Sequence, residues 1–152
     1  MPEHRETRVL PYSPEQVYAL VADVERYPEF LPWCVACRIT RRESPSSFTA
    51  DLAVGFKMVR ERFASRVTLK PIEAITVDYL DGPFAHLTNA WTFAPAPGGS
   101  TAVSFYLSFE FKSKILQGLI GMLFEEAVHR MVSAFEERAK KLYGGKRKDA
   151  AL

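Results

Sequence analysis

The segment from Thr101 to Lys112 constrains the fold of this chain more than any other. Apolar and polar side chains alternate along it, which is the two-residue period of a β-strand. Its large apolar side chains would therefore share one face: Val103, Phe105, Leu107, Phe109 and Phe111. Five such side chains in register need a covering layer that removes them from water. The segment that follows is the remaining part of the chain able to supply that layer.

Residues Ser113 to Tyr143 repeat apolar side chains at the spacing of one helix face. The predicted stripe comprises Ile115, Leu119, Met122, Leu123, Ala127, Met131, Phe135, Ala139 and Leu142. A straight helix of this length would run about 46 Å, so we predict a break or bend at Gly118 or Gly121. Because a helix touches a curved sheet along a line, the space left between them is predicted to be a cavity.

Six further segments have the composition and alternation of strands, and turn residues separate them. They are Glu3 to Pro11, Cys34 to Arg42, Ser47 to Phe56, Val59 to Lys70, Ala74 to Leu80 and His86 to Phe93. Short connections of this kind make consecutive strands antiparallel neighbours. The sequence therefore predicts a seven-stranded antiparallel sheet.

Between the first two strands the sequence predicts a short helix. Ser13 and Gln16 form a capping box around Pro14, and Tyr27-Pro28 ends the helical spacing. The predicted fold class is α+β, with one sheet wrapped around a long C-terminal helix and short helices between strands 1 and 2.

The inward face of the sheet, assigned by alternation, is mostly apolar and aromatic, but three polar side chains interrupt it: Glu61, Ser65 and Asn89. A buried polar group without a partner costs about 1–3 kcal/mol. Two interpretations stay open. In the first, the three residues lie at strand ends that solvent reaches, or a β-bulge makes the assigned strand register wrong. In the second, they are polar groups that bind a ligand in an otherwise apolar small-molecule pocket.

The segment Trp33 to Cys37 contains two cysteines at the spacing of a thioredoxin-like redox motif. Such a motif needs a helix directly after the first cysteine to lower the thiol pKa. Cys34 instead begins a predicted strand, on which alternation would place Cys34 and Cys37 on opposite faces. The pattern favours two structural cysteines in a reducing compartment.

Charge limits the choice of partner. Lys and Arg total 20 against 18 Asp and Glu, a net charge of +2 that is too balanced for a DNA-binding protein. Arg60, Arg62 and Arg66 would share the outer face of one strand and could contact an acidic partner such as ribosomal RNA or anionic lipid. The three histidines are scattered, so no metal site is expected. Without a signal peptide or an apolar run of about 20 residues, a soluble, cytoplasmic protein is expected.

Five motifs occur in order along the chain: Tyr27 to Cys34, Val54 to Phe56, Gly82 to Phe84, Phe109 to Ser113 and Ala134 to Ala139. Together they resemble the coenzyme Q-binding protein family of the START-like, polyketide cyclase/dehydrase superfamily, which is related to the ribosome association toxin family. The resemblance spans roughly Arg8 to Tyr143 and implies a helix-grip fold. We therefore expect a START-like ligand-binding domain at residues 1–145, and the basic residues after the Gly-Gly pair predict a basic flexible tail at residues 146–152. The resemblance also implies non-enzymatic binding of ubiquinone or a similar polyprenyl lipid in support of respiratory electron transfer.

The expected ligand contacts combine the alternation pattern with the family motif around Trp33. They are Phe30, Leu31, Trp33, Phe56, Glu61, Phe63, Ser65, Tyr79, Asn89, Trp91, Phe105, Phe109, Met122 and Phe135. No catalytic residue, metal or required cofactor is expected, and ubiquinone or a similar lipid would be the bound ligand.

The leading hypothesis is a carrier of a quinone or lipid. One alternative is a ribosome-associating toxin-like module that interferes with subunit joining, and another is a cyclase-type enzyme with Glu61 as the base. Lys112, Lys114 and the apolar turn Ile115 to Phe124 would allow transient contact with the inner face of a membrane, although a core helix with flanking lysines explains the same residues.

Overall fold

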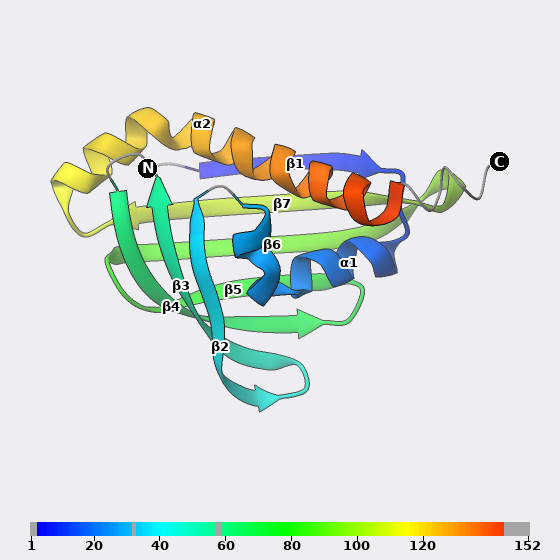
Figure 1. Ribbon diagram of the computed structural model, residues 1–152, viewed down its shortest axis with the longest axis horizontal. Coiled ribbons are helices and arrows are strands. Elements are labelled where there is room, and N and C mark those ends of the chain that lie inside the picture. The colour runs from blue at the N-terminus through cyan, green and yellow to red at the C-terminus, as the bar shows by residue number, and fades with distance from the viewer. Residues whose placement is uncertain (1–2, 32, 57–58, 145–152) are drawn as a thin grey trace.

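The computed structural model describes residues 3–31, 33–56 and 59–144, without the side chains of Phe56, Val59 and Ile120. Seven strands form one antiparallel sheet in the order β1-β7-β6-β5-β4-β3-β2 (Figure 1). They are β1 (Glu3–Leu10), β2 (Cys34–Ser44), β3 (Ser47–Phe56), β4 (Val59–Lys70), β5 (Ala74–Asp81), β6 (Phe84–Ala96) and β7 (Ser100–Phe111). The predicted α+β class and seven-stranded sheet are confirmed. The expected basic tail lies outside the described residues.

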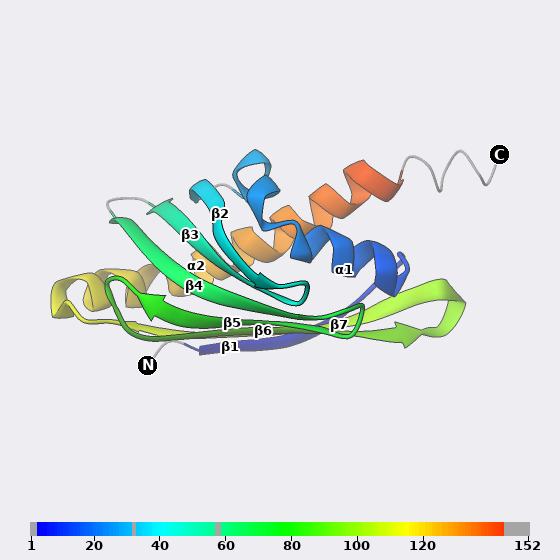
Figure 2. The same ribbon diagram turned by 90° about the horizontal axis from the view of Figure 1, so that it is seen from below.

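The first and last strands of the chain pair with each other. Glu3 of β1 lies opposite Ser108 of β7, and Leu10 lies opposite Thr101. The meander from β2 to β7 is thus extended by the N-terminal strand at its far edge. The helices α1 and α2 lie on one face of the sheet, and the half formed by β2, β3 and β4 curls toward them (Figure 2).

The predicted capping box begins α1 (Pro14–Ala22). The Ser13 hydroxyl accepts a hydrogen bond from the Gln16 backbone N–H at 3.2 Å, and the Gln16 side chain accepts one from the Ser13 N–H at 3.0 Å. A 3-10 helix, η1 (Val24–Glu29), follows α1 and contains Pro28. Together these elements place Tyr27, Leu31 and Trp33 between the sheet and the long helix.

The long C-terminal helix is α2 (Lys114–Ala139), and the π-helical turn η3 (Lys140–Gly144) continues it. The Ser113 side chain caps α2 by accepting a hydrogen bond from the Leu116 N–H. The helix continues through Gly118 and Gly121 without interruption, so of the predicted break or bend, the break is wrong. Each glycine lowers the stability of a helix by about 1 kcal/mol relative to alanine, and the backbone hydrogen bonds of α2 compensate for two such residues.

The buried stripe of the C-terminal helix differs from the prediction at both ends. Ile115 and Met122 are 84% exposed, and Leu142 is also exposed, so these three assignments are wrong. The helix buries Phe124, Val128 and Val132 instead. Apolar residues occur on nearly every side of the N-terminal half of α2, so its hydrophobic period alone does not select the face that meets the sheet.

Candidate functional site

An apolar cavity of about 180 Å³ lies between the concave face of the sheet and α2. Its sheet wall consists of Val54, Phe63, Val77, Phe84, Leu87, Asn89, Trp91, Leu107, Phe109 and Phe111. The helical wall consists of Phe124, Ala127, Val128, Met131 and Phe135, and the connection from η1 to β2 adds Tyr27, Leu31 and Trp33. This is the kind of cavity that was predicted between a curved sheet and the long C-terminal helix.

The size of the cavity limits what the closed protein holds. An engineered cavity of about 150 Å³ accommodates one benzene molecule, whereas sites that surround a drug-sized ligand measure about 300–1,000 Å³. The observed cavity therefore takes one ring or a short stretch of hydrocarbon chain. A longer ligand requires part of the wall to move.

Most polar groups on the cavity wall are already used by the protein. The Asn89 amide donates to the Tyr106 carbonyl at 2.9 Å, and its oxygen accepts from the Trp91 indole N–H at 3.1 Å. The Tyr27 hydroxyl donates to the Val21 carbonyl, and burial raises the pKa of this phenol. Among the described residues the Trp33 indole N–H has no hydrogen-bond partner. The described wall is thus mostly hydrocarbon, and Trp33 is a wall residue whose indole N–H the described protein leaves without a partner.

Half of the predicted ligand contacts lie on the cavity wall. These are Leu31, Trp33, Phe63, Asn89, Trp91, Phe109 and Phe135. Phe30, Tyr79 and Phe105 pack behind the wall, each in ring contact with one of its members. The Phe56 side chain lies outside the described residues.

The remaining three predicted contacts do not line the cavity. Met122 points into solvent because α2 turns its other side toward the sheet. Glu61 is half-buried on β4 and lies outside the wall. Ser65 is fully buried, and its hydroxyl has no partner among the described residues, but it too lies behind the wall. Alternation placed Glu61 and Ser65 on the correct face, yet the cavity occupies only part of that face.

Several wall residues were not among the predicted contacts, and Phe84 shows why. A β-bulge lies between Phe84 and His86, so the pairing with β7 shifts by one residue there. This shift brings Phe84 onto the same face as Leu87 and Asn89, where it stacks on Phe111 at 4.6 Å between ring centres. Gly82, in the preceding turn, has φ of 144°, and a Cβ there would lie 2.7 Å from the Phe63 Cβ. Only glycine fits this close approach.

Aromatic rings hold the C-terminal half of α2 on the cavity. The Phe135 ring centre lies 5.5 Å from that of Tyr27, 5.2 Å from Phe30 and 5.0 Å from Trp91. Edge-to-face arrangements of this kind stabilise a pair by about 0.5–1.5 kcal/mol beyond the area buried. Phe135 therefore connects the helix, η1 and the sheet.

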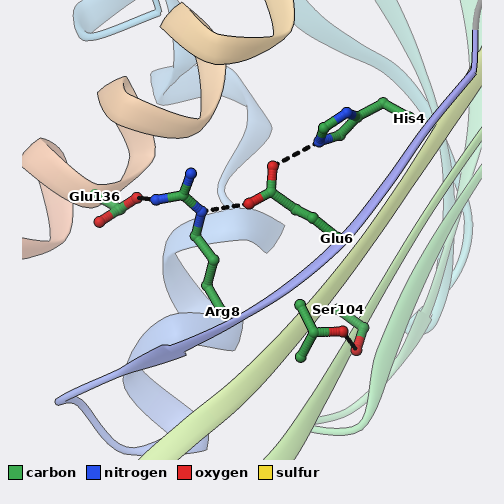
Figure 3. A network of polar contacts seen from close by, with 6 residues as sticks. His4, Glu6, Arg8, Ser104 and Glu136 are labelled. Carbon is green, nitrogen blue, oxygen red and sulfur yellow. Dashed lines mark hydrogen bonds and ion pairs between the residues drawn. The ribbon is translucent and has the colours of Figure 1, made fainter.

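Two ion pairs fix the same half of α2 from opposite sides. Arg8 of β1 contacts both Glu6 and Glu136 of the helix, and His4 lies 2.6 Å from Glu6 (Figure 3). Burial opposes the charge of Glu6, but the hydrogen bonds from Arg8 and His4 outweigh it and lower the pKa of this carboxyl.

On the other side, Arg138 of α2 donates to Glu29 of η1 at 2.9 Å. This hydrogen bond lowers the pKa of Glu29. The Arg138 guanidinium also lies over the Phe30 ring, 5.1 Å from its centre. The end of α2 is thereby attached to both β1 and η1.

The N-terminal half of α2 is held much less firmly. From Lys114 to Leu123 no described side chain is fully buried, and no ion pair joins these residues to the described parts of the sheet. Its polar contact with β7 is a hydrogen bond of 2.8 Å from the Phe111 N–H to Gln117. Local opening costs least where few apolar contacts are buried. This part of the helix does not line the cavity itself, but Leu116, Leu119 and Leu123 cover the wall residues Phe63, Phe84 and Phe111, and it is the part of α2 that we expect to open most readily.

Cys34 and Cys37 both point inward, so their predicted placement on opposite faces is wrong. A β-bulge between Cys34 and Ala36 inserts one extra residue, which leaves Val35 and Ala36 exposed and returns Cys37 to the core side. Burial raises the pKa of Cys34 to about 11 and that of Cys37 to about 12. A redox-active thiol needs the opposite shift.

We expect both thiols to react slowly with iodoacetamide at pH 8 in the folded protein. A thiol with a pKa near 11 is about 0.1% thiolate at this pH, so alkylation should be roughly 100-fold slower than for the unfolded chain. Mass spectrometry of timed samples, with and without denaturant, measures the two rates. Equal rates would show that the cysteines are exposed and ionisable.

Residues 10–136 match the family described as polyketide cyclase / dehydrase and lipid transport. The chain belongs to this family. Ribosome association toxin RatA of Escherichia coli K12 is 37% identical over 146 residues, which cover 96% of this chain and 92% of that protein. Mitochondrial coenzyme Q-binding protein COQ10 homolog B of Xenopus laevis is 38% identical over 146 residues, covering 93% of this chain and 59% of that protein.

Comparison with solved structures shows the same fold in another protein. A START superfamily protein from Mycobacterium smegmatis superposes with a TM-score of 0.78 at 23% identity, covering 92% of this chain and 98% of that protein. This likeness confirms the predicted helix-grip fold, and the two relatives confirm the predicted resemblance. Within the described residues, no helix is both long and apolar enough to span a membrane.

Proposed function

We propose that the cavity binds ubiquinone or a related polyprenyl lipid, and that the protein carries this ligand in support of respiratory electron transfer without transforming it. The observation that carries the proposal is the apolar cavity, whose polar wall groups are nearly all bonded within the protein. The similarity to a coenzyme Q-binding protein and to a family associated with lipid transport supports this ligand class.

The chemistry of the wall supports binding rather than catalysis. Within the described residues, no carboxylate, imidazole or amine lines the cavity. A general base must come within hydrogen-bond reach of its substrate, and Glu61, the candidate base, lies outside the wall. A neutral, largely hydrocarbon ligand suits these surroundings, because a charged ligand would lose its hydration without gaining a partner.

Organic extraction of the purified protein tests the proposal directly. Mass spectrometry of the extract should detect a quinone or another prenyl lipid, and the emptied protein should bind added short-chain ubiquinone. An extract free of lipid, together with no binding of added quinone, would refute the proposal.

Trp33 is the wall residue best suited to recognise a quinone carbonyl. Its indole N–H has no partner in the described residues, whereas the Trp91 N–H is bonded to Asn89. A carbonyl oxygen of the ligand would satisfy this donor, and the rest of the wall would contact ring and tail. We therefore assign the head group to the Trp33 side of the cavity.

Trp33→Phe is expected to weaken the binding of short-chain ubiquinone by roughly three- to tenfold, which is the usual contribution of one neutral hydrogen bond. Affinity for a prenyl hydrocarbon without carbonyl groups should remain unchanged, because phenylalanine keeps most of the apolar surface. Titrations with both ligands on the same variant measure the two effects. An equal loss for both would indicate a purely steric role for Trp33.

A second candidate function is association with the ribosome. Arg38, Arg60 and Arg62 are exposed on the convex face of β2 and β4 and make no ion pair with the described residues, whereas Arg66 lies 3.5 Å from Glu43. The similarity to a protein named ribosome association toxin supports the same candidate, because ribosomal RNA is an acidic partner for exposed arginines.

Co-sedimentation with ribosomal subunits tests this candidate. Reversing Arg38, Arg60 and Arg62 to Glu should abolish sedimentation with the subunits if this face binds RNA. Arg5→Glu is the matched control, because Arg5 is exposed on β1 at the opposite edge of the sheet. Sedimentation that persists in the triple variant would exclude the convex face as the contact.

A further inference from the structure

The outer side of the N-terminal half of α2 carries two large apolar side chains in water. Ile115 and Met122 are each 84% exposed, and a separation of seven residues places them on the same side of the helix. Between them lies Gly118, where an added Cβ would meet no other atom within 4 Å. The described structure leaves this face uncovered.

The charges at the start of this face match an anionic partner, whereas Glu125 and Glu126 follow one turn after Met122, where Glu126 pairs with Arg130 at 3.1 Å. Lys112 and Lys114 are exposed at the start of α2, and its first turn contains no acidic residue. The N-terminus of a helix carries a partial positive charge, so lysines there oppose the helix dipole. They do not stabilise α2, whereas an anionic surface beside them would interact favourably with both the lysines and the helix end.

The same turns of α2 are the loosely held part of the helix and adjoin the cavity. Leu119 and Leu123, on the adjacent side of the helix, pack against the cluster of Phe63, Phe84 and Phe111, whose rings are part of the cavity wall. A partner bound to Ile115 and Met122 would therefore lie next to the segment that opens most readily. Because the proposed ligand dissolves in lipid, a bilayer bound at this location would supply the ligand or receive it.

We propose that Lys112, Lys114, Ile115 and Met122 form a docking surface for an anionic lipid bilayer. The two apolar side chains enter the boundary between head groups and acyl chains, and the two lysines contact lipid phosphates. Docking places the N-terminal half of α2, which opens most readily, against the bilayer that contains the ligand. The proposal deepens the proposed function, on which its role in ligand exchange rests, but docking itself does not require the cavity to be filled.

Flotation with vesicles tests the docking surface. The protein should bind vesicles of phosphatidylcholine with phosphatidylglycerol and bind pure phosphatidylcholine much more weakly. Ile115→Glu with Met122→Glu, and separately Lys112→Glu with Lys114→Glu, should each weaken binding to the anionic vesicles by roughly tenfold or more.

Two matched variants serve as controls and should bind as the parent protein does. Val9→Glu changes an apolar side chain that is 65% exposed on β1, and Lys70→Glu changes an exposed lysine at the end of β4. Binding that is absent in the parent, or equal in all variants, would overturn the proposal. Dimerisation that depends on Ile115 and Met122 would also overturn it, because a second copy would then cover the face.

Short-chain ubiquinone binding without vesicles separates this proposal from the proposed function. The docking variants should retain the parent affinity for the quinone, because none of the four residues lines the cavity. Quinone binding without vesicle binding would reject docking alone, and vesicle binding without quinone binding would reject the proposed ligand alone.

Discussion

Ala127→Phe is expected to reduce the affinity for short-chain ubiquinone by roughly 100-fold, or about 2.7 kcal/mol. Ala127 is half-buried on α2 and lines the cavity. The cavity of about 180 Å³ is close to the size that holds one benzene ring, so a phenyl group from the wall would occupy the place of the ligand. Because the new ring fills empty space, the stability should change by only about 1–2 kcal/mol.

Quenching of tryptophan fluorescence by the quinone measures the affinity, and thermal unfolding shows that the variant is folded. Ser133→Phe is the control, because Ser133 is exposed on the same helix and lines only the outer groove beside Phe30. It should bind quinone as the parent does. A folded Ala127→Phe protein with full affinity would place the ligand outside this cavity.

Phe135→Ala is expected to lower the free energy of unfolding by about 3–5 kcal/mol, in the range measured for large aromatic side chains removed from cores. The variant loses the ring contacts with Tyr27, Phe30 and Trp91 at once. For a chain of this length the corresponding fall in Tm is roughly 10 °C. Urea and thermal unfolding followed by circular dichroism measure both quantities.

Met122→Ala provides the comparison on the same helix. Its side chain is exposed, so the change in stability should stay within about 0.5 kcal/mol. Similar losses for the two variants would mean that the start of α2 is packed as well as its C-terminal half, contrary to the ion pairs and ring contacts described for Phe135, Glu136 and Arg138.

The sequence contained enough information to predict the sheet, because alternation and turn residues act locally. The segment from Ser47 to Phe56 and the one from Val59 to Lys70 were predicted with the bounds that the strands have. The pairing of β1 with β7 joins residues about a hundred positions apart, so no local pattern could reveal it. The continuous course of α2 through its glycines depends on packing along its whole length.

The candidate site was predictable where side chains strictly alternate and unpredictable where the backbone departs from regular geometry. Trp91 and Phe109 lie on the cavity wall as the alternation indicates. The bulges at Phe84 and after Cys34 each change the face of the residues beside them. Met122 was misplaced because the first turns of α2 are apolar on several sides, and only the sheet decides which side is buried.

The two edge strands of the sheet, β1 and β2, also determine how readily the protein associates with other molecules through its sheet edges. An open sheet offers unpaired backbone groups along its edges, and such edges can recruit strands from other molecules. Here β1 carries Glu3, Arg5, Glu6 and Arg8, while β2 is irregular in register at three places and dense in arginine. Strand addition would have to remove these charged side chains from water on β1 and match the irregular edge of β2, and both requirements disfavour it. The strands that border the ligand-binding face therefore also protect the sheet against edge-to-edge association.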